Sequence, residues 1–478
     1  AVSVNKTDAA LPLFKTALEA NPKIEQFWLS YIDALVKNQH FDRARQILKL
    51  ANKKGIDEEK LKTLESQLNP RRDDANPGSP NQQQVDSLLR CFQEKQYGDA
   101  EKLALKMTHD FPMHKFAWKI LGAVLGATGR GSEAIAASQK VIALSPDDAA
   151  AHNNLGVSLK ELGILDEAKA SFSQAISLKP DFAEAYYNLG NTLAELGRLD
   201  EAEASYKQAI LLKPDYAPAF WNLHGIQRTI AGAEEWIDKC LMANMHHLKA
   251  LFTKAALSYY RGDIKQFDDL MQSEFKQHPF TRSMSWVFNL PNLPELYFSK
   301  WYFFDAIVKK SVTSRPFYEF GVWRATSFKY LIEFYRKGYG FDTFTGLPED
   351  WLDKCGNIAQ KAGTYTSNGN VPEIEGGEFI VGKFEDTLPV FFSESRPTAS
   401  LINFDADLYS STICALNFSR AVIDEDTILI FDEFIVNESW EQDEFKALEE
   451  FCFINEFSYE VIAVSFFSKQ VAIRLVGI

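Results

Sequence analysis

The chain has 478 residues, a net charge of −14 at pH 7 and five cysteines. This length exceeds what one ordinary hydrophobic core organises, so two or three domains are expected. A composition of 46% apolar and 24% charged residues is typical of a globular protein, and no apolar stretch is long enough to span a membrane. The scattered cysteines and the absence of a signal-peptide pattern predict a reduced, cytoplasmic location.

The negative charge is concentrated near the C-terminus. From residue 312 onward, 13 Lys and Arg stand against 27 Asp and Glu, whereas the first 311 residues balance. Such an acidic region repels phosphates, which argues against nucleic acid as a partner. It suits a small substrate that is neutral or bridged by a cation.

A 34-residue repeat is visible from about residue 115 to 223. Leucine, alanine and proline recur at this spacing, at Leu121, Leu155, Leu189 and Leu223, at Ala100, Ala134, Ala168 and Ala202, and at Pro112, Pro146, Pro180 and Pro214. Small residues let paired helices approach closely, and the prolines end each second helix. The pattern resembles the tetratricopeptide repeat (TPR), which implies an all-α solenoid.

The period and the composition together divide the chain into five segments. Ala10 and Ala44 extend the period backward, so residues 1–68 are interpreted as degenerate repeat-like helices, followed by a polar, turn-rich linker at 69–84. Residues 85–225 are the repeats proper. Residues 226–311 keep a helical pattern and are interpreted as a bridging segment that overhangs an active site in residues 312–478.

Two roles remain open for the repeat array. It is either a rigid spacer or dimerisation surface, which leaves a homo-oligomer open, or a concave surface that binds a protein partner or a carrier-linked substrate. The sequence favours the second role but does not identify the partner.

Residues 317–334 begin the C-terminal half with a short apolar strand, an acidic residue, a glycine turn and an amphipathic helix. Gly321 permits close approach of the backbone to a ligand, and the helix N-terminus presents free N–H groups. Any strand-turn-helix unit offers these features. Asp342 ends the next strand, 23 residues after Glu319, near the spacing at which doubly wound folds place an acid on a ribose hydroxyl.

Paired carboxylates follow two further strands. Asp405 and Asp407 follow the apolar run 401–404, and Asp432 and Glu433 follow the run 428–431. If these strands are neighbours, the four carboxylates meet at the edge where open α/β sheets bind ligands. Their repulsion then requires a cation or a shared proton. The alternative is that these residues only cap a helix, end a strand or lie in a surface loop.

Alternating strands and helices that end in a hairpin at 459–476 predict a mostly parallel sheet with a C-terminal antiparallel hairpin. This order fits a class I, Rossmann-like methyltransferase better than a dehydrogenase, and the half contains no G-x-G-x-x-G. Five ordered motifs resemble the macrocin O-methyltransferase family: Glu319-Phe-Gly-Val, Gly340-Phe-Asp-Thr-Phe-Thr-Gly-Leu-Pro-Glu, Phe384-Glu-Asp-Thr-Leu-Pro, Asp405-Ala-Asp-Leu-Tyr-Ser-Ser-Thr and Asp432-Glu-Phe.

The resemblance covers about residues 312–478, a third of the chain. It implies an enzyme that uses S-adenosylmethionine and a divalent cation to methylate a hydroxyl of a sugar or a glycosylated small molecule. One departure is Ala325, which stands where that family usually has a second glycine. A less open cofactor turn is therefore expected.

The resemblance also implies residue roles. Asp405, Asp432 and Glu433 correspond to the metal ligands, Asp407 to the general base and Asp342 to the ribose-binding acid. Further candidates for cofactor binding are Glu319, Gly321, Ser327 and Phe384. Two of these have alternatives, because Glu319 is also suited to be a structural acid that bonds backbone amides and Phe384 to pack in the core. Trp323, Tyr409 and Trp440 are candidates either for lining the pocket or for packing.

The composition constrains the same chemistry independently. All eight histidines lie at or before His278, so the C-terminal half has none. A proton acceptor there must be a carboxylate, Lys, Tyr or Cys, and oxygen-only ligation favours Mg²⁺ over zinc.

Two rival hypotheses remain. In one, the chain is a TPR interaction scaffold with a vestigial methyltransferase fold. In the other, the enzyme acts on a protein or peptide that the repeats hold.

Overall fold

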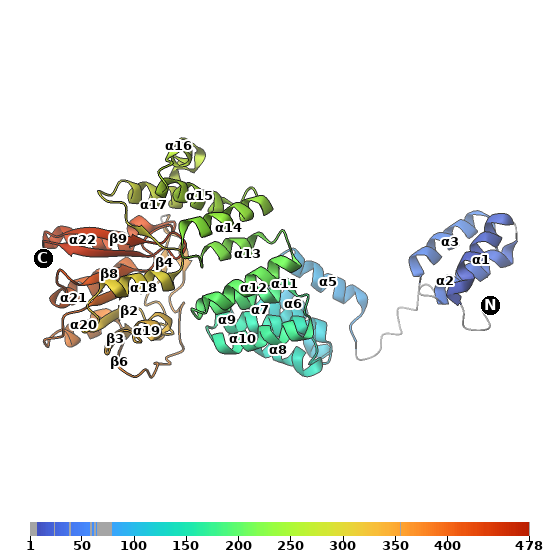
Figure 1. Ribbon diagram of the computed structural model, residues 1–478. Helices are drawn as coiled ribbons and strands as arrows, with labels where there is room; N and C mark the ends of the chain where they lie inside the picture. Colours follow the sequence, from blue (N-terminus) through green and yellow to red (C-terminus); the bar gives the residue numbers. More distant parts are fainter. Residues whose placement is uncertain are drawn as a thin grey trace. The chain divides into compact units, whose positions relative to one another are not determined.

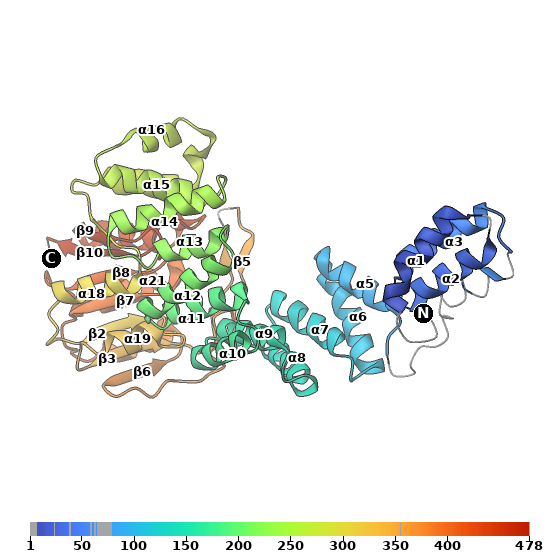
Figure 2. The same cartoon turned by 45° about the vertical axis from the view of Figure 1, so that its right-hand side comes forward.

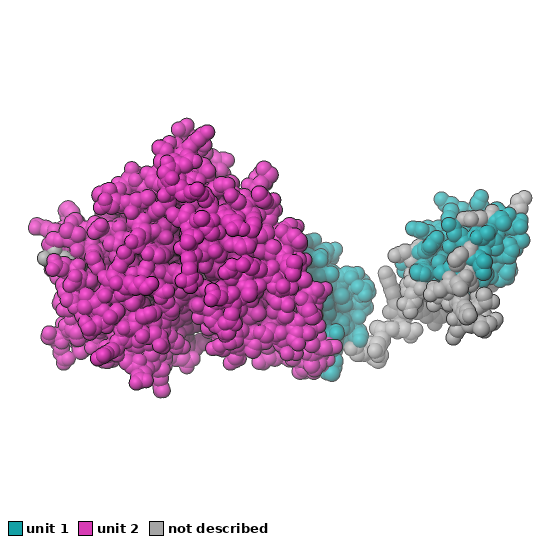
Figure 3. Space-filling model, in the orientation of Figure 1, with its two compact units in different colours: residues 1–129 teal, residues 130–478 magenta. Residues whose placement is uncertain are grey.

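The computed structural model describes residues 7–22, 24–37, 40–57, 60–61, 64, 79–353 and 355–477. The chain divides into two compact units, residues 1–129 and 130–478 (Figure 3). The boundary falls within the range 85–225 that the sequence pattern assigns to one repeat domain.

Most of the predicted linker, residues 69–84, lies outside the described residues. Its last three residues are helical, in contrast to the prediction, because a helix begins at Gln82. Asn81 caps this helix: its side chain accepts the backbone N–H of Gln84, and the Gln84 side chain accepts the backbone N–H of Asn81, both at 2.9 Å.

The first unit is helical throughout its described elements. These are α1 (Thr7–Ala20), α2 (Glu25–Lys37), α3 (Phe41–Lys53), α5 (Gln82–Gln93), α6 (Tyr97–Asp110) and α7 (Lys115–Ala127).

The second unit opens with paired helices that repeat every 34 residues. They are α8 (Gly131–Leu144), α9 (Ala149–Glu161), α10 (Leu165–Leu178), α11 (Ala183–Glu195), α12 (Leu199–Leu212) and α13 (Ala217–His224). The predicted prolines Pro146, Pro180 and Pro214 each follow the end of a second helix.

Close helix packing explains the repeated glycines. A Cβ built on Gly156 would lie 2.7 Å from the ring of Phe172, and one on Gly190 would lie 2.6 Å from the ring of Tyr206. Both rings are buried. The helical solenoid predicted from the 34-residue spacing is confirmed.

The regular elements of the segment 226–311 are helices and one short strand. They are α14 (Ile230–Ala243), α15 (Leu248–Tyr260), α16 (Lys265–Met271), the 3₁₀ turn η2 (Glu274–Gln277), α17 (Pro279–Phe288), β1 (Glu295–Leu296) and α18 (Lys300–Lys310). Strand β1 pairs in parallel with the strand Ser458–Val464 and so belongs to the sheet of the C-terminal half. The sequence analysis missed this strand because two residues carry no alternation.

The C-terminal half is an α/β fold built on an eight-stranded sheet in the order β1-β9-β10-β8-β7-β2-β3-β6. Its other strands are β2 (Phe317–Phe320), β3 (Gly338–Asp342), β6 (Gly377–Val381), β7 (Leu401–Phe404), β8 (Ile428–Phe431), β9 (Ser458–Val464) and β10 (Val471–Val476). The five strands from β8 to β6 are parallel to one another, and β10 runs antiparallel to β8 and β9. The predicted mostly parallel sheet with a terminal hairpin is confirmed.

Two smaller strands, β4 (Trp351–Leu352) and β5 (Ile358–Gln360), form a separate ribbon. The helices of this half are α19 (Thr326–Leu331), α20 (Phe384–Phe391), α21 (Tyr409–Ser419) and α22 (Glu444–Asn455), with 3₁₀ turns η3 (Arg420–Val422) and η4 (Trp440–Gln442).

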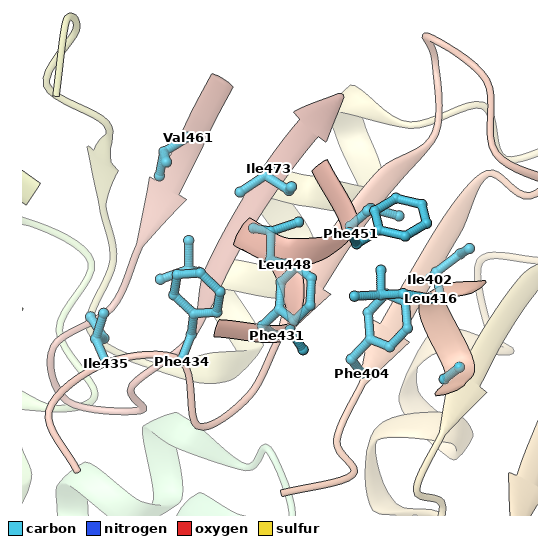
Figure 4. Close-up of a cluster of buried hydrophobic side chains, with 14 of the residues drawn as sticks. Ile402, Phe404, Leu416, Phe431, Phe434, Ile435, Leu448, Phe451, Val461 and Ile473 are labelled. Carbon is cyan, nitrogen blue, oxygen red and sulfur yellow. The ribbon is translucent and has the colours of Figure 1, made fainter. Parts of the chain in front are cut away.

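Both faces of the central strands are buried, which accounts for their continuous apolar runs. Phe404 and Phe431 point into a core shared with α21 and α22, where Leu416, Leu448 and Phe451 also lie (Figure 4). The alternate residues of the same strands, such as Leu401, Ile428 and Ile430, face a second core.

Repeat helices supply part of that second core. It joins Leu193 of α11 and Tyr206 of α12 to Trp301 and Phe304 of α18. Both ribbon views show α11 and α12 beside the α/β region (Figures 1 and 2). The repeats of the second unit are therefore fixed to the sheet domain by a common hydrophobic core.

Among the described residues, no helix combines the length and the apolar character needed to cross a membrane.

We predict that Gly156→Ala and Gly190→Ala destabilise the second unit, each by about 1–3 kcal/mol, because the new methyl group meets a buried ring. Gly126→Ala in α7 is the matched control: no described atom lies within 4 Å of its Cβ position, and alanine favours a helix by up to about 1 kcal/mol. Chemical unfolding followed by helical circular dichroism measures the difference. Equal stability of the three variants would contradict the packing argument.

Candidate functional site

A cavity of about 270 Å³ opens at the carboxyl ends of β2, β3, β7 and β8. Eight of the nine predicted site residues line it: Gly321, Ser327, Asp342, Phe384, Asp405, Asp407, Asp432 and Glu433. Glu319 does not. Trp323 also lines the cavity, whereas Tyr409 and Trp440 do not. Parallel strands bring residues that are distant in sequence to one edge, as open α/β sheets do.

The glycine turn after β2 passes directly against the end of β7. Gly321 has a φ of +91°, and a Cβ on it would lie 1.8 Å from the carbonyl oxygen of Asp405. No other residue type fits without moving backbone. The close approach that requires this glycine is therefore to the chain itself.

Asp342, the last residue of β3, holds the turn in place. Its Oδ2 accepts the backbone N–H groups of Val322 and Trp323, both at 2.7 Å, and its Oδ1 accepts that of Phe344 at 2.5 Å. A carboxylate has about four acceptor positions, so one remains for a ligand hydroxyl. Asp342 is thus a brace for the turn as well as the candidate ribose contact.

Glu319 lies beneath the turn and is fully buried. Its Oε1 accepts the hydroxyl of Ser327 at 2.6 Å, and its Oε2 has no partner among the described residues. Burial raises the pKa of Glu319 to about 8. The placement agrees with the alternative of a structural acid, although its partner is a hydroxyl and not backbone amides.

The four carboxylates after β7 and β8 converge because these strands are paired neighbours with Phe404 opposite Phe431. Burial, together with Asp432 and Asp407, raises the pKa of Asp405 well above its usual value. Burial and the nearby Glu433 raise the pKa of Asp407 to about 8. Asp407 also has a left-handed backbone, with a φ of +59°, which is uncommon outside glycine and often marks functional sites.

Basic and amide side chains partly offset this negative charge. Lys469 donates to Oε2 of Glu433 and Gln470 donates to Oδ1 of Asp432, both at 2.6 Å. Lys300, the first residue of α18, also lines the cavity. Burial raises the pKa of Asp432 to about 6, and the nearby charge of Lys300 opposes part of this rise.

These pairings bear on the predicted cation. Glu433 and Asp432 each give an oxygen to a neighbouring side chain, and within the described part of the chain no three His, Cys, Asp or Glu residues are grouped to hold a metal ion. Asp405, Asp432 and Glu433 are therefore not arranged as a set of metal ligands in this structure, and no step is derived through a metal ion. Magnesium stays a prediction from the resemblance.

Several lining residues were not singled out in the sequence. Lys300 and Arg324 are examples, and Lys383 and Tyr365 are others. A lysine at the start of a helix in the segment before residue 312 carries no local sequence signal that it will line a cavity of the C-terminal half. The prediction that the segment 226–311 overhangs the site was the nearest indication, and Lys300 lies in that segment.

Ala325 occupies the position where the resemblance expects a second glycine. Its backbone is left-handed, with φ +59° and ψ +31°, as a glycine would be. The residue is fully buried and belongs to the second core. It does not line the cavity. Its methyl group therefore leaves the cavity as open as a glycine would.

Comparison with known proteins identifies the repeats. Models described as tetratricopeptide or TPR repeat match residues 1–68, 121–168, 158–197 and 183–216. The chain therefore carries tetratricopeptide repeats, which supports a repeat-based interaction scaffold. The comparison with curated proteins finds no match.

Solved structures of repeat proteins are similar to part of the chain. PilW, a widely conserved type IV pilus biogenesis factor, has a TM-score of 0.40 and 18% identity over 43% of this chain and 100% of its own. PilF of Pseudomonas aeruginosa has a TM-score of 0.38 and 16% identity, over 42% of this chain and 95% of its own. A thermophilic TPR protein of Thermus thermophilus has a TM-score of 0.34 and 20% identity, over 37% of this chain and 98% of its own.

We predict that Glu319→Gln flattens the pH dependence of stability between pH 4.5 and about 8. In this window the folded chain keeps a proton that the unfolded chain has lost, so stability falls as pH rises. Removing one such group changes the slope by up to about 1.4 kcal/mol per pH unit. Chemical unfolding at a series of pH values measures it, with the exposed Glu385→Gln as control. An unchanged slope would show that Glu319 is ionised when folded.

Proposed function

We propose that the chain is an interaction scaffold fused to an S-adenosylmethionine-dependent O-methyltransferase. In this proposal the repeats hold a protein partner or a substrate carrier, and the acceptor is a hydroxyl of a sugar or a glycosylated small molecule. The comparisons match the repeats alone, so the enzymatic part rests on the cavity. Its principal support is the convergence of the Gly321 turn, Asp342 and Asp407 in one cavity at the carboxyl edge of a parallel sheet.

S-adenosylmethionine, when bound, supplies a methyl group on a positively charged sulfur. Transfer of that methyl group to a hydroxyl oxygen would release the hydroxyl proton, so the chain would have to supply a group that takes this proton. Asp407 is the proposed acceptor of that proton. Its raised pKa, about 8, is closer to working pH than that of an ordinary aspartate, which suits a general base.

The remaining residues orient and balance charge. Asp342 fixes the turn that forms one wall of the cavity. A cationic ligand such as a sulfonium would relieve the repulsion between the carboxyl groups of Asp405 and Asp432 in the cavity lining, whereas an anionic ligand would add to it. Lys300 and Lys469 keep the excess of negative charge within what a buried site tolerates.

The alternative function is a TPR scaffold whose sheet domain is vestigial, and the comparisons favour this alternative. In the sequence, Ala325 in place of the family's usual glycine favours this alternative, since it predicts a less open cofactor turn. Because that methyl group packs in the core and not in the cavity, Ala325 does not argue against ligand binding. A third candidate keeps the enzyme and takes a protein or peptide held by the repeats as acceptor.

Isothermal titration of the full chain with S-adenosylmethionine is the direct test, and we expect saturable binding. No binding at millimolar concentration would leave the vestigial scaffold as the function. Mass spectrometry of small molecules that co-purify with the protein would identify an acceptor or product.

We predict that Asp407→Asn slows methyl transfer by about 10²-fold or more, because the proton acceptor is lost. The affinity for the cofactor should change little, because the cavity keeps its shape. Asp386→Asn, at an exposed aspartate of α20, is the control and should leave transfer unchanged. Running the assay with EDTA and with added Mg²⁺ tests the predicted cation. Full turnover by Asp407→Asn would refute its role.

We also predict that Ala325→Gly leaves the affinity for S-adenosylmethionine within about twofold. The substitution relieves about 1 kcal/mol of left-handed strain and removes a buried methyl group of similar value, so stability also changes by less than about 1 kcal/mol. Titration and chemical unfolding measure the two quantities. A large gain in affinity would show that the alanine does obstruct the ligand.

A further inference from the structure

Three glycines occupy the same turn of successive repeats. Gly129, Gly163 and Gly197 lie between the first and second helix of a pair, 34 residues apart, with φ values of +77°, +67° and +75°. Their surroundings differ. A Cβ on Gly129 would have no described atom within 4 Å, one on Gly197 would contact the ring of Trp301 at 3.5 Å, and one on Gly163 would lie 2.0 Å from Nη1 of Arg324.

Arg324 connects the repeat turn to the cavity. Its Nη2 donates to the carbonyl oxygen of Glu161, the last residue of α9, at 3.1 Å. Its guanidinium lies over the ring of the neighbouring Trp323, 4.0 Å from the ring centroid. Arg324 and Trp323 both line the cavity. One side chain therefore contacts the repeats at one end and shapes the cavity wall at the other.

The wall that Arg324 belongs to is strained. Gly321, Trp323 and Ala325 all have positive φ, at +91°, +47° and +59°. Such a run persists only where its surroundings determine it. Asp342 holds it from the sheet side through two backbone N–H groups. From the repeats, Glu161 and Gly163 contact the side chain of Arg324, which belongs to this turn.

A second repeat contact lies beside another lining residue. Nε1 of Trp301 donates to the carbonyl oxygen of Ala194 in α11 at 2.7 Å, and Trp301 directly follows Lys300. Successive repeats thus abut two segments that line the cavity.

We propose that the repeat turn Glu161–Gly163 holds Arg324 and, through it, the wall of the ligand cavity, so that Arg324 is a positioning residue and ligand affinity depends on the repeats. The choice of ligand rests on the proposed function; the structural coupling does not. By linkage, a partner that displaces this turn would lower ligand affinity, and bound ligand would oppose that partner.

The test compares Gly163→Ala with Gly129→Ala in the full chain. Both substitutions place alanine at a similar positive φ, so they share the backbone strain, but only the first displaces Arg324. Hydrogen–deuterium exchange of residues 321–329 reports the wall without any ligand, since the amides of Val322, Trp323 and Ala325 are hydrogen-bonded there. Titration with S-adenosylmethionine reports affinity.

We expect Gly163→Ala to speed exchange in residues 321–329 and to weaken S-adenosylmethionine binding by about fivefold or more, and Gly129→Ala to change neither. Arg324→Ala should reproduce both effects. In the Arg324→Ala background, Gly163→Ala should add nothing, because its effect passes through that side chain.

Equal exchange in the two glycine variants, or an unaltered wall in Arg324→Ala, would overturn the coupling. If the unsubstituted chain fails to bind S-adenosylmethionine while Gly163→Ala still speeds exchange, the proposed cofactor is wrong and the positioning role stands. If Gly163→Ala does not fold, Arg324→Ala gives both readouts with the repeat turn intact.

Discussion

The convergence of four carboxylates at the ends of two adjacent parallel strands is the constraint on which the rest of the site depends. Strands β7 and β8 pair with Phe404 opposite Phe431, so the acids that follow them cannot avoid one another. Burial and the neighbouring carboxyl groups raise the pKa of Asp405 and of Asp407 there, as expected for like charges that repel one another at close range. Lys469, Gln470 and Lys300 come from the terminal hairpin and from α18 to meet this charge.

That requirement links parts of the chain that are distant in sequence. The hairpin β9–β10 supplies Lys469 and Gln470, and its strands extend the sheet beyond β8. Strand β1 then adds to the outer edge, which places α18 over the sheet with Lys300 at its start. The segment before residue 312 is therefore an integral part of the site and not only a connection to it.

The repeats of the second unit belong to the same construction. Leu193 and Tyr206 share a core with Trp301 and with strand residues such as Leu401 and Ile428. A sheet with both faces apolar must be covered on both. Helices α20, α21 and α22, together with α15 and α17 of the segment 226–311, cover one face, and α18, α19 and the repeats cover the other. A solenoid attached in this way has a route to influence the cavity that a flexibly tethered one lacks.

Local patterns were sufficient for much of this. The 34-residue spacing predicted the repeats, because each helix pair needs small residues at fixed positions. The apolar runs before Asp405 and Asp432 predicted buried parallel strands, and the acids that follow these runs were expected to meet if the two strands were neighbours. Gly321 was assigned to a tight turn for the right geometric reason, but its near neighbour is the carbonyl of Asp405 and not a ligand.

What the sequence by itself determined is the set of elements and the residues at the ends of the strands, since these follow from periodicity and from residue type. Tertiary structure alone decided the partners: Lys469 on Glu433, Ser327 on Glu319, and Arg324 on the turn at Gly163. It also decided that Ala325 faces the core. These pairings join residues that are 8 to 163 positions apart in the sequence. A local pattern does not encode such pairs, because they form only when the two faces of the sheet are covered by helices from other parts of the chain.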